Sequence, residues 1–195
     1  MTERAAAVLT YWGMFYTLIG TAAATLIGLM FIVITLVMGT NRVRRSRTGI
    51  STFSTPTVVH FGAALIFSAT LLVPWHMLLG VAIILGLGGL MGLIYVVRLF
   101  TRQYNFSDYE PDAEDWIWYT TLPIVAYAAV VMGAVIICLN PTLALSIFAA
   151  TTTLLLVIGI HNSWDIVTYI TISEGKDDPP DTENPPTDTE EGENP

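Results

Sequence analysis

The residues of this chain that could do chemistry lie near the end of its last apolar stretch. Residues 159–165 read Gly-Ile-His-Asn-Ser-Trp-Asp. His161 and Asp165 are four residues apart, which places both side chains on one face of a helix. Asp165 is the only acidic residue inside an apolar stretch, where a charge is costly. This cost makes the segment a candidate functional site.

A second histidine is expected at the same depth. His60 follows Pro56 by four residues, and proline is favoured in the first turn of a helix. That spacing places His60 roughly 6 Å inside the membrane boundary near which His161 lies. The two side chains would meet if their helices are neighbours. The sequence therefore predicts one polar intramembrane cluster, made of His60, His161, Asn162 and Asp165.

Three chemistries could use this cluster. A histidine beside a carboxylate suits proton relay, because small environmental changes move its charge across physiological pH. Two histidines and a carboxylate could also supply three metal ligands, with His76 too far away on the opposite face. In the third interpretation Asp165 accepts hydrogen bonds from His161, Asn162 or a neighbouring helix and fixes helix packing. The structural interpretation leads, so no metal, cofactor or catalytic residue is assigned.

Enzyme signatures are missing from the sequence. It contains no Gly-x-Ser-x-Gly, no His-Glu-x-x-His and no Gly-x-x-x-x-Gly-Lys pattern, the motifs of several hydrolase and nucleotide-binding classes. It also has no paired carboxylates within the apolar stretches. We therefore expect a protein that is not an enzyme.

The elements that carry these residues are transmembrane helices. The chain has 195 residues, of which 53% are hydrophobic and only 12% are charged, about half the charged fraction of a typical soluble domain. Charged residues are absent from 5–41, 48–97 and 116–164, and a span takes about 20 apolar residues. The runs are continuously apolar, whereas the strands of a membrane barrel would alternate. The fold class expected is an all-α membrane bundle.

Five transmembrane helices fit these stretches. Two tight hairpins are expected, one at Pro74-Trp75-His76 and one at Asn140-Pro141, because proline disfavours a continuing helix. A short N-terminus (1–10) precedes the transmembrane domain (11–172). The predicted spans are 11–38, 57–73, 77–97, 116–139 and 142–170, with loops at 39–56 and 98–115.

Basic residues set the predicted orientation. Seven Lys and Arg residues follow the first, third and fifth spans, and only Arg4 lies on the other side. Because basic residues concentrate on the cytoplasmic side, we expect an external N-terminus and a cytoplasmic C-terminus. The tryptophans fall near predicted span ends, as in the aromatic belts of membrane proteins.

The acidity belongs to the C-terminal tail. From Ile172 onward nine acidic residues oppose Lys176 alone, which accounts for the formal net charge of −8. Residues 173–195 also contain prolines and no aromatic residue, so we expect a disordered acidic cytoplasmic tail. A tail of this kind could dock a basic partner. The pattern is unlike the basic, clustered footprint of a nucleic-acid-binding protein.

Small residues recur at helix-packing spacing. Gly20, Ala24 and Gly28 are four residues apart in the first span, and Gly88 and Gly92 repeat that step in the third. Such spacing lets helix backbones approach closely in lipid. The faces could pack inside one protomer, or they could bind a membrane-protein partner or a second copy of the chain.

Three segments carry a resemblance to known proteins. They are Thr-Pro-Thr-Val-Val-His-Phe at 55–61, His-Asn-Ser-Trp-Asp at 161–165 and the small-residue run at 20–29. With these, residues 11–170 resemble an uncharacterised group of small bacterial multi-pass membrane proteins. The resemblance implies a bacterial cytoplasmic (inner) membrane and brings no activity with it. We expect a structural or accessory component, the alternative being a small channel or transporter with a proton- or ion-responsive site.

Overall fold

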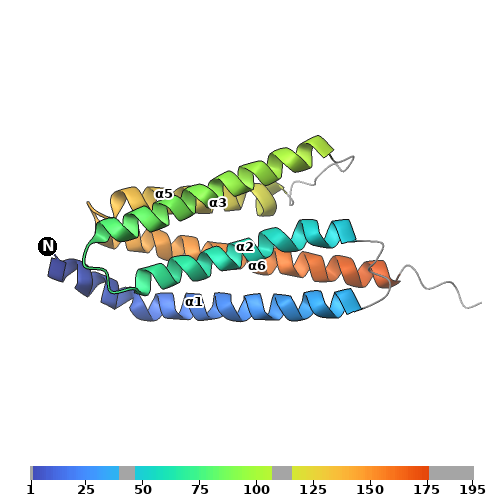
Figure 1. Ribbon diagram of the computed structural model, residues 1–195, viewed down its shortest axis with the longest axis horizontal. Coiled ribbons are helices and arrows are strands. Elements are labelled where there is room, and N and C mark those ends of the chain that lie inside the picture. Colours follow the sequence, from blue (N-terminus) through green and yellow to red (C-terminus); the bar gives the residue numbers. More distant parts are fainter. Residues whose placement is uncertain (1, 40–46, 107–115, 176–195) are drawn as a thin grey trace, which may run out of the picture.

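The computed structural model describes residues 2–39, 47–106 and 116–175, and these form a bundle of long antiparallel helices (Figure 1). The predicted acidic tail beyond Gly175 and the acidic part of the 98–115 segment lie outside the described residues. The elements in chain order are α1 (Thr2–Gly39), α2 (Arg47–Leu72), α3 (Leu78–Phe106), the short π-helix η2 (Ile117–Thr121), α5 (Leu122–Ile136) and α6 (Pro141–Gly175).

Four apolar helical stretches in the described chain are long enough to cross a membrane. They are Thr10–Thr35, Leu78–Thr101, Ile117–Ile136 and Pro141–Asp165, and Pro56–Leu72 is a shorter fifth apolar helix. The expectation of an all-helical membrane bundle is therefore confirmed at this level. Large side chains such as Leu87 and Met91 face outward, as in helices that contact lipid.

Two helix ends differ from the expected loops. We placed Pro56 in the first turn of a helix, but it lies inside α2, which already begins at Arg47. Likewise α3 continues past Val97 to Phe106. Both extensions contain arginine and other polar residues. Hydropathy marks where a helix leaves the apolar zone rather than where its hydrogen bonding stops.

The helices form two layers (Figure 1). In one layer α1 packs on α2 and α2 packs on α6, while α3 packs mainly on α5, which in turn contacts α6. The start of α1 and both hairpin turns lie at one end of the bundle, and the ends of α3 and α6 lie at the other. We call these the hairpin end and the tail end.

Both hairpin turns are held by local contacts. At the first, Trp75 donates its indole N–H to the carbonyl of Thr70 at 2.7 Å, and its ring lies against Gly80. At the second, the Asn140 side chain accepts a hydrogen bond from the Leu143 amide at 3.1 Å. Asn140 thus caps α6, and Pro141 follows at the first helical position, where a missing N–H costs nothing.

Glycines let aromatic rings into the contacts between helices. Gly88 lies under the ring of Phe67, Gly92 under Tyr127 and Gly133 under Phe148. A Cβ at Gly88 would stand 2.7 Å from the Phe67 ring, closer than side-chain atoms pack. Lipid removes the hydrophobic drive between helices, so close packing of this kind stabilises the bundle.

Candidate functional site

The side chains of His161 and Asp165 lie next to each other near the tail end of α6. His161 Nδ1 is 3.2 Å from Asp165 Oδ2, and the side chains are 23% and 39% exposed. The contact is an ion pair when the imidazole is protonated. The i, i+4 spacing brings them together within one helix, as the sequence predicts.

The π-helix η2 brings two aromatic side chains to this pair. Pro123, the second residue of α5 after η2, has no N–H to offer the carbonyl of Tyr119 four residues earlier. The backbone forms a wider turn here, in which the Leu122 N–H donates a hydrogen bond to the carbonyl of Ile117, five residues earlier. Such π turns often occur at functional sites.

Both aromatic residues of η2 contact the pair. The Trp118 ring stacks on the His161 imidazole at a centroid distance of 3.9 Å and an angle of 6°. The Tyr119 hydroxyl donates a long hydrogen bond of 3.4 Å to Asp165 Oδ2. Trp118, Tyr119, His161 and Asp165 form the tail-end cluster, which ties the start of the η2–α5 segment to α6.

His60 makes a different contact. It is 1% exposed, and its Nδ1 is 3.0 Å from the hydroxyl of Tyr127 on α5. The Tyr127 ring also lies against Gly92 of α3. This buried hydrogen bond therefore joins α2 to α5, with α3 packed against the same ring.

The structure does not unite the predicted cluster. His60 pairs with Tyr127, whereas His161 pairs with Asp165 and Trp118. Within the described part of the chain, no group of three or more His, Cys, Asp and Glu side chains could hold a metal ion. Helices α2 and α6 are neighbours as expected, but His60 turns towards α5. The interpretation of these three residues as metal ligands therefore finds no geometric support.

Asn162 is the most deeply buried member of the predicted cluster. Its side chain is 0% exposed, and neither Oδ1 nor Nδ2 has a hydrogen-bond partner among the described residues. A buried carboxamide without partners is rare in folded proteins.

The predicted packing residues divide into two groups. Gly20 is buried against Ser68 of α2, and Gly88 and Gly92 lie under aromatic rings. Ala24 is exposed, and Gly28 is exposed with open space around it. Gly20 therefore packs inside the protomer, whereas Ala24 and Gly28 in the next two turns of α1 face outward.

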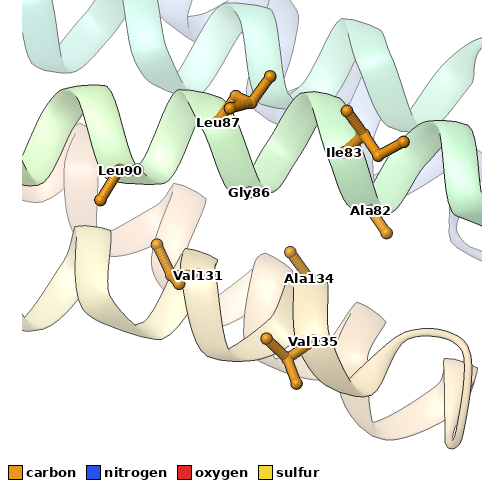
Figure 2. A pocket seen from close by; sticks show the side chains of 8 residues that line it. All are labelled: Ala82, Ile83, Gly86, Leu87, Leu90, Val131, Ala134 and Val135. Carbon is orange, nitrogen blue, oxygen red and sulfur yellow. The ribbon is translucent and has the colours of Figure 1, made fainter.

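An apolar groove runs between α3 and α5 (Figure 2). Gly86 and Leu87 belong to one wall, and Val131 and Ala134 to the other. A Cβ at Gly86 would stand 3.4 Å from the Cβ of Ala134, so α3 and α5 approach each other closely at these two small residues. None of the residues that line the groove is charged or carries a polar side chain, so it offers acyl-chain contact and no catalytic group.

Sequence reasoning missed the three aromatic partners. Trp118 was expected only as a belt residue, and Tyr119 and Tyr127 were not singled out. A tyrosine inside an apolar stretch needs a hydrogen-bond partner, which is the signal that could have marked Tyr127.

Comparison of the chain with known protein families, curated proteins and solved structures gives no match.

Proposed function

We propose that this protein is a multi-pass component of a bacterial inner membrane with a structural or accessory role and no enzymatic activity. The observation that supports the proposal is the hydrogen bonding of His60 and Asp165. Each is engaged by an aromatic residue from another helical segment, Tyr127 or Tyr119. Polar side chains that hydrogen-bond across helices act as connections within a membrane bundle.

The proposed topology has five spans, an external N-terminus and a cytoplasmic C-terminus. In support, the last turns of α3 and α6 lie at the tail end, while both hairpin turns lie at the other (Figure 1). The C-terminal part of α3 carries Arg98. Cys138, the only cysteine, is exposed in the second hairpin turn. Chemical labelling of Cys138 therefore shows on which side of the membrane the hairpin end lies.

A membrane-impermeant maleimide tests this topology. It should label Cys138 in spheroplasts without lysis. The matched variant carries Cys138→Ser and Thr101→Cys, which moves the thiol to an exposed position towards the tail end, and it should react only after lysis. The reverse pattern would invert the topology.

A partner completes the proposed role. Either another membrane protein or a second copy of the chain fits, because exposed Ala24 and Gly28 allow another helix to approach α1 closely. Purification from native membranes in mild detergent should retain a stoichiometric partner or a homo-oligomer. This association should be lost at a high detergent concentration. A strictly monomeric protein under several cross-linker lengths would contradict the accessory role. Comparison with a chain lacking residues 173–195 tests whether the acidic tail contributes.

A small channel or transporter is the second candidate. It is favoured by the partial exposure of His161 and Asp165 at the tail end, where a proton or ion could reach them from water. Proton flux into vesicles containing the pure protein tests it, with Asp165→Asn as the variant. Flux that depends on pH and disappears in Asp165→Asn would favour transport over the accessory role.

A further inference from the structure

Helical spacing places the buried side chain of Asn162 near the face of α6 that packs against α2. Gly159, one turn earlier on the same face, lies directly against the ring of Phe61. Asn162 is three residues further towards the tail end, about 4.5 Å along the axis. Because α2 runs in the opposite direction, the same displacement along α2 leads from Phe61 to Val58, next to Thr57 and two residues from Pro56.

The part of α2 at this level is polar and interrupted. Thr57 is 0% exposed and, four residues before Phe61, shares its helix face. Pro56 lies inside α2 and is buried. Since proline has no N–H, the carbonyl of residue 52 lacks its usual helical donor. Ordered water is one of the groups that satisfy such freed carbonyls in membrane helices.

We propose that Asn162 binds a buried water molecule between α2 and α6, beside the interruption at Pro56. The two atoms of Asn162 without partners are a donor, Nδ2, and an acceptor, Oδ1. Water donates and accepts, so it can serve both atoms, whereas a metal ion would leave Nδ2 unpaired. Buried waters typically make about three hydrogen bonds, and we expect the carbonyl freed by Pro56 to supply a further partner. This inference does not depend on the proposed function.

Water-edited solid-state NMR of the full chain in lipid bilayers tests the proposal. Magnetisation from water should reach Asn162 Cγ about as quickly as it reaches the partly exposed Asp165 carboxyl. It should reach fully buried Ile158, one turn away on the same helix, several-fold more slowly. An Asn162 signal that builds up as slowly as that of Ile158 would overturn the proposal.

The thermal stability of Asn162→Leu gives an independent test in detergent. If water joins Asn162 to α2, the substitution breaks that connection and lowers Tm by several degrees. If the site is dry, leucine removes an unpaired amide and raises Tm, which would also overturn the proposal. The matched control is Ser68→Ala, whose buried hydroxyl also lacks a partner among the described residues. Gly20 of α1 lies close to the Cβ of Ser68, and we expect this substitution not to lower Tm.

Discussion

Replacing Tyr127 by phenylalanine removes one oxygen atom from the centre of the bundle. The lost hydroxyl is 3.0 Å from His60 Nδ1, and both residues are 1% exposed, so water cannot readily replace it. Hydrogen bonds between membrane helices contribute about 0.6 kcal/mol on average and up to about 1.7 kcal/mol. The His60 nitrogen left behind would be buried and unpaired, so we expect a loss of about 1–1.5 kcal/mol in the free energy of unfolding.

A double-mutant cycle isolates the contact. Unfolding is measured by reversible SDS titration in mixed micelles for the wild type, Tyr127→Phe, His60→Leu and the double variant. The double variant has no unpaired polar group at this position, so it should be more stable than the sum of the single losses predicts, by about 1 kcal/mol. The control is Tyr11→Phe, which removes the same hydroxyl from a ring that is 85% exposed and should change stability by less than about 0.5 kcal/mol.

Additive losses of stability in this cycle would refute the proposed contribution of the His60–Tyr127 hydrogen bond. If the losses of Tyr127→Phe and His60→Leu add to within about 0.3 kcal/mol, the two side chains do not share a hydrogen bond. A Tyr127→Phe variant as stable as the wild type would lead to the same conclusion. Either result would also remove the main support for a structural role of His60.

Three further predictions concern other contacts. Gly159→Ala should lower stability by about 1–3 kcal/mol, because its methyl group meets the Phe61 ring, whereas Gly28→Ala, which has open space, should be neutral or slightly stabilising in the same titration. Asp165→Asn should cost less than about 1 kcal/mol, because the pair with His161 is partly exposed; a loss above 2 kcal/mol would show that the carboxylate is essential to the fold. In a Cys138→Ser background, Gly28→Cys should form disulfide-linked dimers in native membranes if α1 meets a second copy, and Met91→Cys on exposed α3 should not.

The helices could be predicted from sequence because the membrane imposes them. Every backbone polar group must be paired within the apolar zone, so a continuous apolar run of sufficient length has helix as its simplest solution. The second hairpin could also be predicted from adjacent residues, because Asn140 caps the helix that Pro141 begins. The His161–Asp165 pair follows from helical periodicity alone. All these features depend on neighbours in sequence.

The partners of the polar residues could not be predicted in this way. His60 and Tyr127 are 67 residues apart, and nothing local to either one indicates which face of α2 turns towards α5. The contact of Trp118 with His161 depends on a π turn, and a regular helix is the default expectation from hydropathy. The pattern of apolar residues also hides the continuation of α2 through Pro56, because proline is common both at helix starts and within membrane helices.

Polar contacts specify helix pairing more sharply than the apolar surface does. Exposed leucines and isoleucines occur on several helices. Lipid tails solvate these side chains equally well in many different helix arrangements, so apolar side chains do not favour one neighbouring helix over another. The hydrogen bond of His60 can be made only when α5 presents Tyr127 at the right height, and Gly92 of α3 then admits the ring. One polar residue thereby fixes the relation of three helices. The same reasoning applies to Asp165, which accepts a hydrogen bond from Tyr119 in the π-helix η2. The structural role that we propose accounts in this way for a histidine and an aspartate inside apolar helices.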